Sequence, residues 1–331
     1  MRSAMYRLGT RVLTLIGQLT LFLGASYLLL YKNPTAFRLT AWPLSSPLEV
    51  LPSPRILARA LRQLVWRYGA HPLWRETVGY IWHTLTFQFG TSLTYPEVPL
   101  WHKVLSAMPI TLELVLTSAI LGLVLGVLLG LVAALRAHTW IDRLLGGLAH
   151  VGRGVPSFVI AAGAIWFFGA LLPGLLPVHG WEPPSTAILP IGILFLANFA
   201  AVFHRFRGGF QEAMRQDYMM TARAKGLRQG AQVLRHGLVN AGMDLLRVAG
   251  PMLALTVVNA VWVENLFVVP GMGSLTATGV ANVDGPLMMT SLFLLVLLAM
   301  ALKTAVDLTY WLVDPRRRRE RVPLLGRSRQ A

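Results

Sequence analysis

Four ionisable side chains interrupt long apolar runs of this sequence: Glu113, Glu264, Lys303 and Asp307. A charge at the centre of a hydrocarbon layer costs about 2.5 to 3.5 kcal/mol on insertion scales. Each of the four is therefore expected to face protein, water or the end of its apolar run. Lys303 and Asp307 are four residues apart on one helix face, which favours a local pair. Glu113 is expected in the first turn of its run and Glu264 near the end of its own, where they either line a pathway for a cationic group or make structural hydrogen bonds.

No other arrangement of reactive side chains indicates catalysis. The chain has 8 His and 0 Cys, and no His pair has the HxxxH or HExxH spacing of a metal site. His204 and His236 are too isolated in the sequence to predict a metal ligand. The chain has no GxxxxGK[ST] phosphate loop either, so any nucleotide must be bound by another subunit. We expect no catalytic, cofactor-binding or metal-ligating residue, and no enzyme activity in this chain alone.

The composition indicates a polytopic helical membrane protein. Of 331 residues, 55% are hydrophobic and only 13% are charged, whereas soluble domains average about 25% charged residues. Apolar runs of about 20 residues recur, long enough as helices to cross a hydrocarbon core of roughly 30 Å. The net charge of +16 does not favour nucleic-acid binding, because no basic face is interleaved with stacking aromatic residues.

Six spans are expected, at about 12–31, 110–135, 155–176, 187–203, 249–269 and 287–313. Basic residues gather on one side of this arrangement, as the positive-inside bias predicts, with both termini in the cytosol. The first span is expected to be a retained anchor ending domain 1–31; a cleaved signal peptide is the alternative. Residues 32–108 form a long extracytoplasmic segment, in which Arg55–Tyr68 is either a surface helix at the outer mouth or a helix packed on its own domain. The membrane-spanning core is 109–317, with a short basic loop expected before the third span, and 318–331 is a basic cytosolic tail.

Glycines in the second span repeat every four residues, at Gly122, Gly126 and Gly130. They fall on nearly one helix face, where small residues let another helix approach closely. Packing is the expected role, and pore lining is the alternative.

A polar, basic insert at about 206–247 separates the fourth and fifth spans. Residues 221–225 (TARAK) favour a helix that Gly226 would end as a C′ glycine. Ala231–Leu238 reads as a second short helix. Such an insert either seats in a groove of a partner protein or lies on anionic headgroups.

The fifth span ends in Pro270, Gly271, Met272 and Gly273, which disfavour a continuing helix. This stretch is either a gate that re-enters the outer mouth or a plain surface loop.

An ordered set of motifs resembles one family, the ABC-importer permeases of the dipeptide/oligopeptide/nickel type. The matching pieces, running from about Phe87 to Arg317, are FGTS at 89–92, PITLEL at 109–114, VPSF at 155–158, DY at 217–218, TARAKGL at 221–227, RHGLVNA at 235–241, Glu264, PGMG at 270–273, Asp307 and DPR at 314–316. The sequence departs from the family where Met220-Thr221-Ala222 replaces the general Glu-Ala-Ala, where Val269 replaces Trp, and where the turn at 31–34 lacks the usual APGDP-like form.

The resemblance implies an all-α polytopic membrane protein with the type I ABC-importer permease fold. The insert would be the coupling loop that docks on an ATPase, through Glu212, Asp217, Tyr218, Thr221, Ala222, Arg223, Ala224, Lys225, Gly226, Arg235 and Asn240. The gate or pathway candidates would be Glu113, Glu264, Pro270, Gly271 and Gly273.

The implied function is that of a transmembrane permease subunit of an ATP-driven importer of peptides. The implied partners are a second homologous permease, two cytosolic ATPase subunits that bind ATP and Mg, an extracytoplasmic substrate-binding protein and membrane lipid, in a bacterial inner membrane. Nickel, a metallophore or glutathione is the alternative cargo within the family. Alternatives of another class are a secondary transporter driven by an ion gradient and an assembly scaffold.

Overall fold

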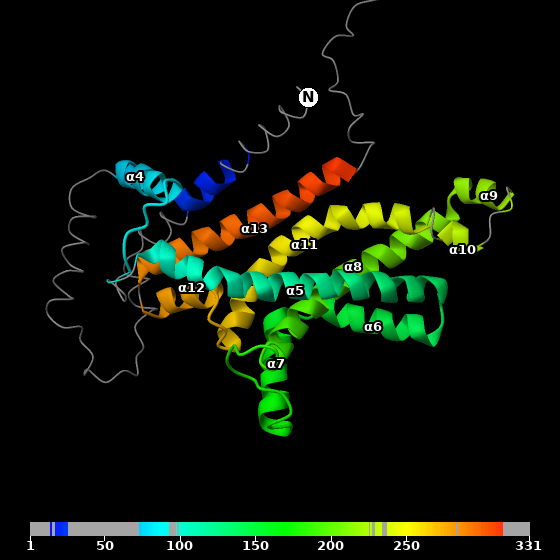
Figure 1. The fold of residues 1–331 in the computed structure, drawn as a ribbon, viewed down its shortest axis with the longest axis horizontal. Helices are drawn as coiled ribbons and strands as arrows, with labels where there is room; N and C mark the ends of the chain where they lie inside the picture. The colour runs from blue at the N-terminus through cyan, green and yellow to red at the C-terminus, as the bar shows by residue number, and fades with distance from the viewer. Residues whose placement is uncertain are drawn as a thin grey trace, which may run out of the picture. The chain divides into compact units, whose positions relative to one another are not determined.

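A computed structural model describes residues 14, 17–25, 73–92, 97, 99–224, 226, 229–233, 237–282 and 284–313. Helices are the regular elements of this part of the chain (Figure 1), together with one isolated bridge between Thr91 and Pro99. The all-α expectation is therefore confirmed. The chain divides into two compact units, Met1–Ile110 with Pro270–Leu297, and Thr111–Val269 with Leu298–Ala331.

The first unit contains α4 (Leu73–Leu85), α12 (Met272–Ala281), the start of α5 (Leu100–Leu135) and the start of α13 (Gly285–Val313). Three aromatic rings pack together in it: Phe87, Phe89 and Phe293, with centroids 5.7, 6.3 and 5.8 Å apart. The turn from α12 to α13 requires glycine at 279, because an added Cβ would lie 2.6 Å from the backbone nitrogen of Met288. Thr276 donates a hydrogen bond to Ser291 (2.9 Å) across the same turn.

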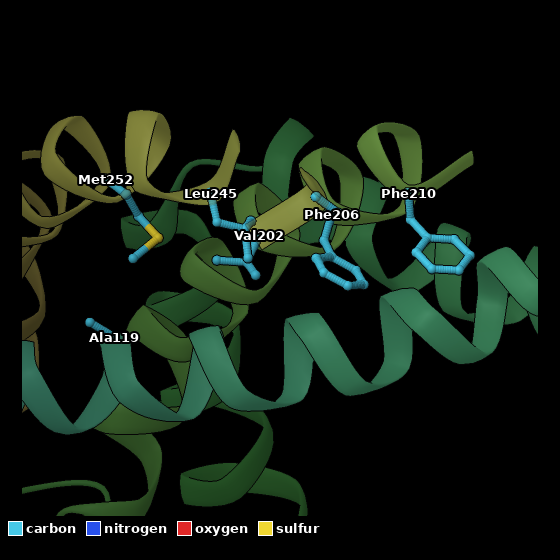
Figure 2. Packing of buried hydrophobic residues seen from close by; sticks show 7 residues of the cluster. Ala119, Val202, Phe206, Phe210, Leu245 and Met252 are labelled. Atoms are coloured by element: carbon cyan, nitrogen blue, oxygen red, sulfur yellow. The ribbon is translucent and has the colours of Figure 1, made fainter. Parts of the chain in front are cut away.

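The second unit is built around α8 (Ile188–Arg215), which packs against α6 (Trp140–Gly154) and α11 (Leu238–Leu266). Its other elements are the rest of α5 and of α13, α7 (Ser157–Trp166), the π-helix η1 (Phe167–Leu171), α9 (Asp217–Ala224) and α10 (Gln229–Gln232). Four phenylalanines of α8, Phe199, Phe203, Phe206 and Phe210, recur at spacings of four and three and are all buried. This helical periodicity turns one face of α8 into the core. Figure 2 shows Phe206 and Phe210 in a cluster with Ala119, Val202, Leu245 and Met252.

The glycine face of α5 lies against α8, as predicted. A Cβ at Gly122 would lie 2.5 Å from the Cβ of Asn198, and one at Gly126 would lie 2.7 Å from Val202. At Gly130 the nearest atom would be in the Phe206 ring, at 3.3 Å. These glycines therefore allow close helix packing rather than line a pore.

Four helices of the described chain are long and apolar enough to cross a membrane: Leu100–Leu135, Ile188–Arg215, Ala241–Leu266 and Gly285–Val313. A fifth candidate is the pair of α6 with α7 and η1, bent by 105°. The four helices match the expected second, fourth, fifth and sixth spans, whereas half of the first expected span lies outside the described residues and its described half, 14 and 17–25, is helical. Six spans, and the positions of the termini, therefore remain a prediction.

The expected basic loop before the third span is wrong, because residues 140–154 form the helix α6. Gly152 of α6 lies so close to the backbone carbonyl of Leu196 in α8 that no Cβ would fit. Ala149 is fully buried in a cluster with Phe199 and Phe203. Packing on α8 thus stabilises a helix whose glycines disfavour it locally.

Candidate functional site

The segment between α8 and α11 forms a short helical protrusion of the second unit. Gln216, with an extended backbone (ψ 152), ends α8, and α9 begins at Asp217. Gly226 follows α9 with φ +76, the left-handed conformation that glycine adopts without steric cost. The prediction that Gly226 ends the first short helix is confirmed. The second short helix was expected at Ala231–Leu238, of which 234–236 lie outside the described residues. α10 covers Gln229–Gln232, and the described residues 233, 237 and 238 are also helical.

The protrusion exposes most of the side chains that the structure describes in it. Tyr218 is 40% exposed and Met220 is 66% exposed, whereas Met219 between them is 1% exposed. Met219 therefore anchors α9 while its neighbours remain open for contact with another molecule.

Several predicted docking residues take part in local hydrogen bonds. Glu212, exposed in the last turn of α8, accepts a bond from the Gln216 amide (2.6 Å). Thr221 donates to the backbone carbonyl of Asp217 (3.4 Å). The remaining predicted residues fall into three groups: Ala224 and Gly226 are exposed, Ala222, Arg223 and Asn240 are described only as helical backbone, and Lys225 and Arg235 lie outside the described residues.

The protrusion is continuous with the packed core on both sides. Gly237, directly before α11, lies against Phe210 of α8, and an added Cβ would lie 2.5 Å from its ring. Phe210, Phe206 and Leu245 then continue the contact between α8 and α11 (Figure 2). The protrusion is therefore joined to both α8 and α11 at its base.

An ion pair that the sequence analysis did not predict joins α6 to the same end of α8. Arg207 donates from Nε to Asp142 Oδ1 and from Nη2 to Oδ2, both at 2.7 Å. The backbone N–H of His138 also donates to Asp142 Oδ2 (3.0 Å). This two-bond geometry is the strong form of the Arg–carboxylate pair. The two residues are 65 positions apart, so no local pattern indicates the contact.

A buried polar contact links α5, α8 and α11, nearer the start of α8 than the ion pair of Arg207. The Asn198 amide donates to Ser118 Oγ (3.3 Å), and Thr256 donates to Asn198 Oδ1 (2.7 Å). Because all three residues are buried, these bonds fix the register of the helices.

The two predicted pathway acids have different environments. Glu264 is fully buried and accepts a hydrogen bond from Thr111 (2.7 Å), which is the structural alternative named above. Glu113 is exposed and lies thirteen residues into α5, so its expected place in the first helical turn is wrong. The helix begins at Leu100, before the expected start near Ile110, and contains Pro109, which donates no backbone hydrogen bond.

The PGMG stretch separates α11 from the short helix α12. Pro270 is exposed, and Gly271 and Gly273 are buried, with α12 starting at Met272. Lys303 and Asp307 of α13 form the predicted local pair (3.2 Å). The helix break is confirmed, and a gating role for it stays a prediction.

A cavity of about 790 Å³ opens in the second unit. Its wall combines the turn between α6 and α7 (residues 152–158) with one side of α8 and one side of α11. From α8 come Ala197, Ala201, His204 and Arg205, and from α11 come Val248, Leu255, Asn259 and Trp262. Its polar members were not predicted, because no spacing rule groups them together in the sequence.

Comparison with known proteins agrees with this architecture. The family model described as "Binding-protein-dependent transport system inner membrane component" matches residues 126–319. The dipeptide transport system permease protein DppB of Lactococcus lactis is 32% identical over 265 residues, 80% of this chain and 87% of that protein. DppB of Bacillus subtilis is 32% identical over 246 residues, 74% of this chain and 79% of that protein.

Two solved structures share the fold. The MetNI methionine ABC transporter in an inward-facing conformation aligns with a TM-score of 0.52 and 18% identity, over 64% of this chain and 96% of that one. An amino acid ABC transporter crystallised with histidines aligns with a TM-score of 0.51 and 15% identity, over 63% and 92%. The sequence-based resemblance is thus confirmed, and this chain belongs to the family of binding-protein-dependent transport system inner membrane components.

Proposed function

We propose that this chain is a multi-pass permease subunit of an ATP-driven importer whose cargo is peptides. The observation that carries the proposal is the extent of the match: the family model covers 126–319, and dipeptide permeases are 32% identical over 80% of the chain. That region includes the docking protrusion, α8, α11 and the cavity.

The cytosolic partner in this proposal is an ATPase that binds ATP and Mg²⁺ itself. The protrusion, residues 216–237, seats in a groove of that partner, and closure of the ATPase displaces α9. Because Phe210 and Gly237 join the protrusion to α8 and α11, both helices move with it. Arg207 and Asp142 carry α6 along, and α6 leads into the turn that lines the cavity. The cavity then opens alternately to the two sides of the membrane.

The complete importer in this proposal contains a second, homologous permease, two ATPase subunits and an extracytoplasmic binding protein, surrounded by lipid of a bacterial inner membrane. The transport path lies between the two permeases, so this chain supplies half of its wall. The cavity beside α8 and α11 is our candidate for that half.

Uptake by membrane vesicles tests the function. Peptides carried by the copurifying binding protein should enter vesicles loaded with ATP and should be excluded from vesicles loaded with a nonhydrolysable analogue. Mass spectrometry of the ligand on the binding protein identifies the cargo as peptide, glutathione or nickel complex. Uptake that persists without ATP and stops when the proton or sodium gradient is dissipated would instead indicate a secondary transporter. Purification of the complex without any ATPase would also contradict the proposal.

A further inference from the structure

We propose that the cavity bounded by the α6–α7 turn, α8 and α11 is a subsite for the carboxylate of a peptide, and that it rejects a bare metal cation. This inference rests on the proposed transport function and names the chemical class of its cargo. It is carried by the shape of the cavity, by its polar atoms and by its charge.

The shape of the cavity suits an extended solute. On α11 its wall runs from Val248 to Trp262, fourteen residues that correspond to about 21 Å of helix. At one position the rings of Phe158 and Trp262 lie 6.1 Å apart and form an aromatic side of the wall. A peptide of a few residues fits this length, and its variable side chains can contact the apolar surface without a fixed geometry.

Three polar groups of the wall have free hydrogen-bonding capacity. His204 Nε2 is buried without a hydrogen-bond partner among the described residues. The side chains of Ser157 and Asn259, also on the wall, make no hydrogen bond to another residue of the described chain. Buried polar groups are normally paired, so the unpaired His204 Nε2 is unusual, while Ser157 and the half-buried Asn259 can bond a solute that supplies donors and acceptors along its length. A peptide backbone supplies both.

The charge of the wall selects an anionic group. Arg153 and Arg205 line the cavity, and none of the lining residues is Asp, Glu or Cys. The acid nearest to Arg205 is Asp244, at 3.6 Å, and the Arg205 side chain remains 45% exposed. Two guanidinium groups attract a carboxylate. The same two groups repel a bare divalent cation, which prefers carboxylate, imidazole or thiolate ligands. His204 alone cannot replace such a ligand set.

The test is solute binding to the purified complex of permeases and ATPases. The binding protein is left out, so that the membrane subunits alone determine which solute binds. The probes are an equimolar mixture of Ala-X-Ala tripeptides, the same mixture as C-terminal amides, glutathione, and nickel chloride, each measured by equilibrium dialysis. We expect tripeptides with a free carboxylate to bind roughly tenfold more tightly than their amides, because a charge-assisted contact is lost. If glutathione binds and the tripeptides do not, the cavity still binds a carboxylate, and glutathione is the solute that supplies it.

The matched variants are Arg153→Gln/Arg205→Gln and Arg136→Gln/Arg143→Gln. Both remove two positive charges from the same part of the chain, but Arg136 and Arg143 are exposed and away from the cavity. The first variant should bind acids and amides equally, and the second should keep the wild-type preference. Equal binding of acids and amides by the wild type, or specific nickel binding that the Arg153→Gln/Arg205→Gln variant retains, would overturn the inference. ATP-dependent uptake by the wild type in vesicles would still support the transport function in that case, so the two failures are distinguishable.

Discussion

Along α8 the four buried phenylalanines all precede residue 211, whereas beyond Gln216 the chain exposes Tyr218 and Met220. The first region is held by tertiary contacts: glycines of α5 and α6 that admit no side chain, an ion pair to α6, and hydrogen bonds to Thr256 and Ser118. The second region is held by short helices and one left-handed glycine.

This difference in packing indicates that the packed part of α8 and the protrusion that follows it have different roles. A densely packed region moves as a unit, because interiors resist deformation. A protrusion with few internal contacts gains its fixed geometry from a partner. Changes in the protrusion should therefore impair transport without altering stability, and changes in the core should lower stability first.

The largest effect is expected from Gly226→Val, which should reduce uptake roughly tenfold or more, since a β-branched residue at φ +76 is a strained outlier. ATP hydrolysis should then be uncoupled from uptake, with membrane insertion and melting temperature unchanged. Gly208→Val is the matched control, because a side chain at 208 also meets open space, needs no left-handed backbone and lies outside the protrusion. Gly226→Asn should retain most uptake, since Asn tolerates this region. Normal uptake by a well-expressed Gly226→Val variant would refute the role of the turn.

Gly152→Ala should lower the free energy of unfolding by about 1 to 3 kcal/mol, the usual cost of overpacking. Its Cβ would overlap the backbone carbonyl of Leu196, which cannot rotate away. Gly146→Ala, on the same helix but facing open space, should be neutral or slightly stabilising. Thermal unfolding of the detergent-solubilised complex measures both, and equal melting temperatures would contradict the packing of α6 on α8.

Asp142→Asn should destabilise the protein by roughly 1 to 2 kcal/mol, between the values for exposed and buried pairs. Asp142 has 9% of its side chain exposed and Arg207 has 28%, so solvent screens the pair only in part. The reversed pair Asp142→Arg with Arg207→Asp should recover part of the loss in a double-mutant cycle. Additive effects of the two single changes would show that the pair contributes nothing.

Lys303→Met should change stability by only a few tenths of a kcal/mol, because an exposed i,i+4 pair contributes about that much. Its side chains are 46% and 30% exposed. A loss above about 1 kcal/mol in the same unfolding assay would assign Lys303 a role beyond its pairing with Asp307.

The features that the sequence predicted are those governed by local chemistry. Gly226 was predictable because a glycine after a helix-favouring run adopts a left-handed backbone at low cost, and Gly122, Gly126 and Gly130 because their spacing defines a helix face. Other features depend on tertiary contacts. The helix α6 was missed because its glycines disfavour a helix that packing on α8 then stabilises. Glu113 was misplaced because the apolar run begins near Ile110, whereas the helix already begins at Leu100.

The candidate cavity could not be predicted at all from patterns. Ser157, His204 and Asn259 come from three helices and meet only after folding. Asp142 and Arg207 are brought together in the same way. A sequence from one chain contains no signal for such pairs when their separation exceeds a few helical turns.

The most direct test of the account is site-specific cross-linking of the protrusion to the ATPase, for which the natural absence of cysteine (0 Cys) provides a clean background. Met220→Cys places a thiol on the 66% exposed position of α9, and Ser185→Cys provides an exposed control in the predicted outer turn. A short bifunctional reagent should join Met220→Cys to the ATPase subunit, more so with ATP bound, and should leave Ser185→Cys unlinked. No cross-link from Met220→Cys, or equal linking from both positions, would contradict the assignment of residues 216–237 as the docking site.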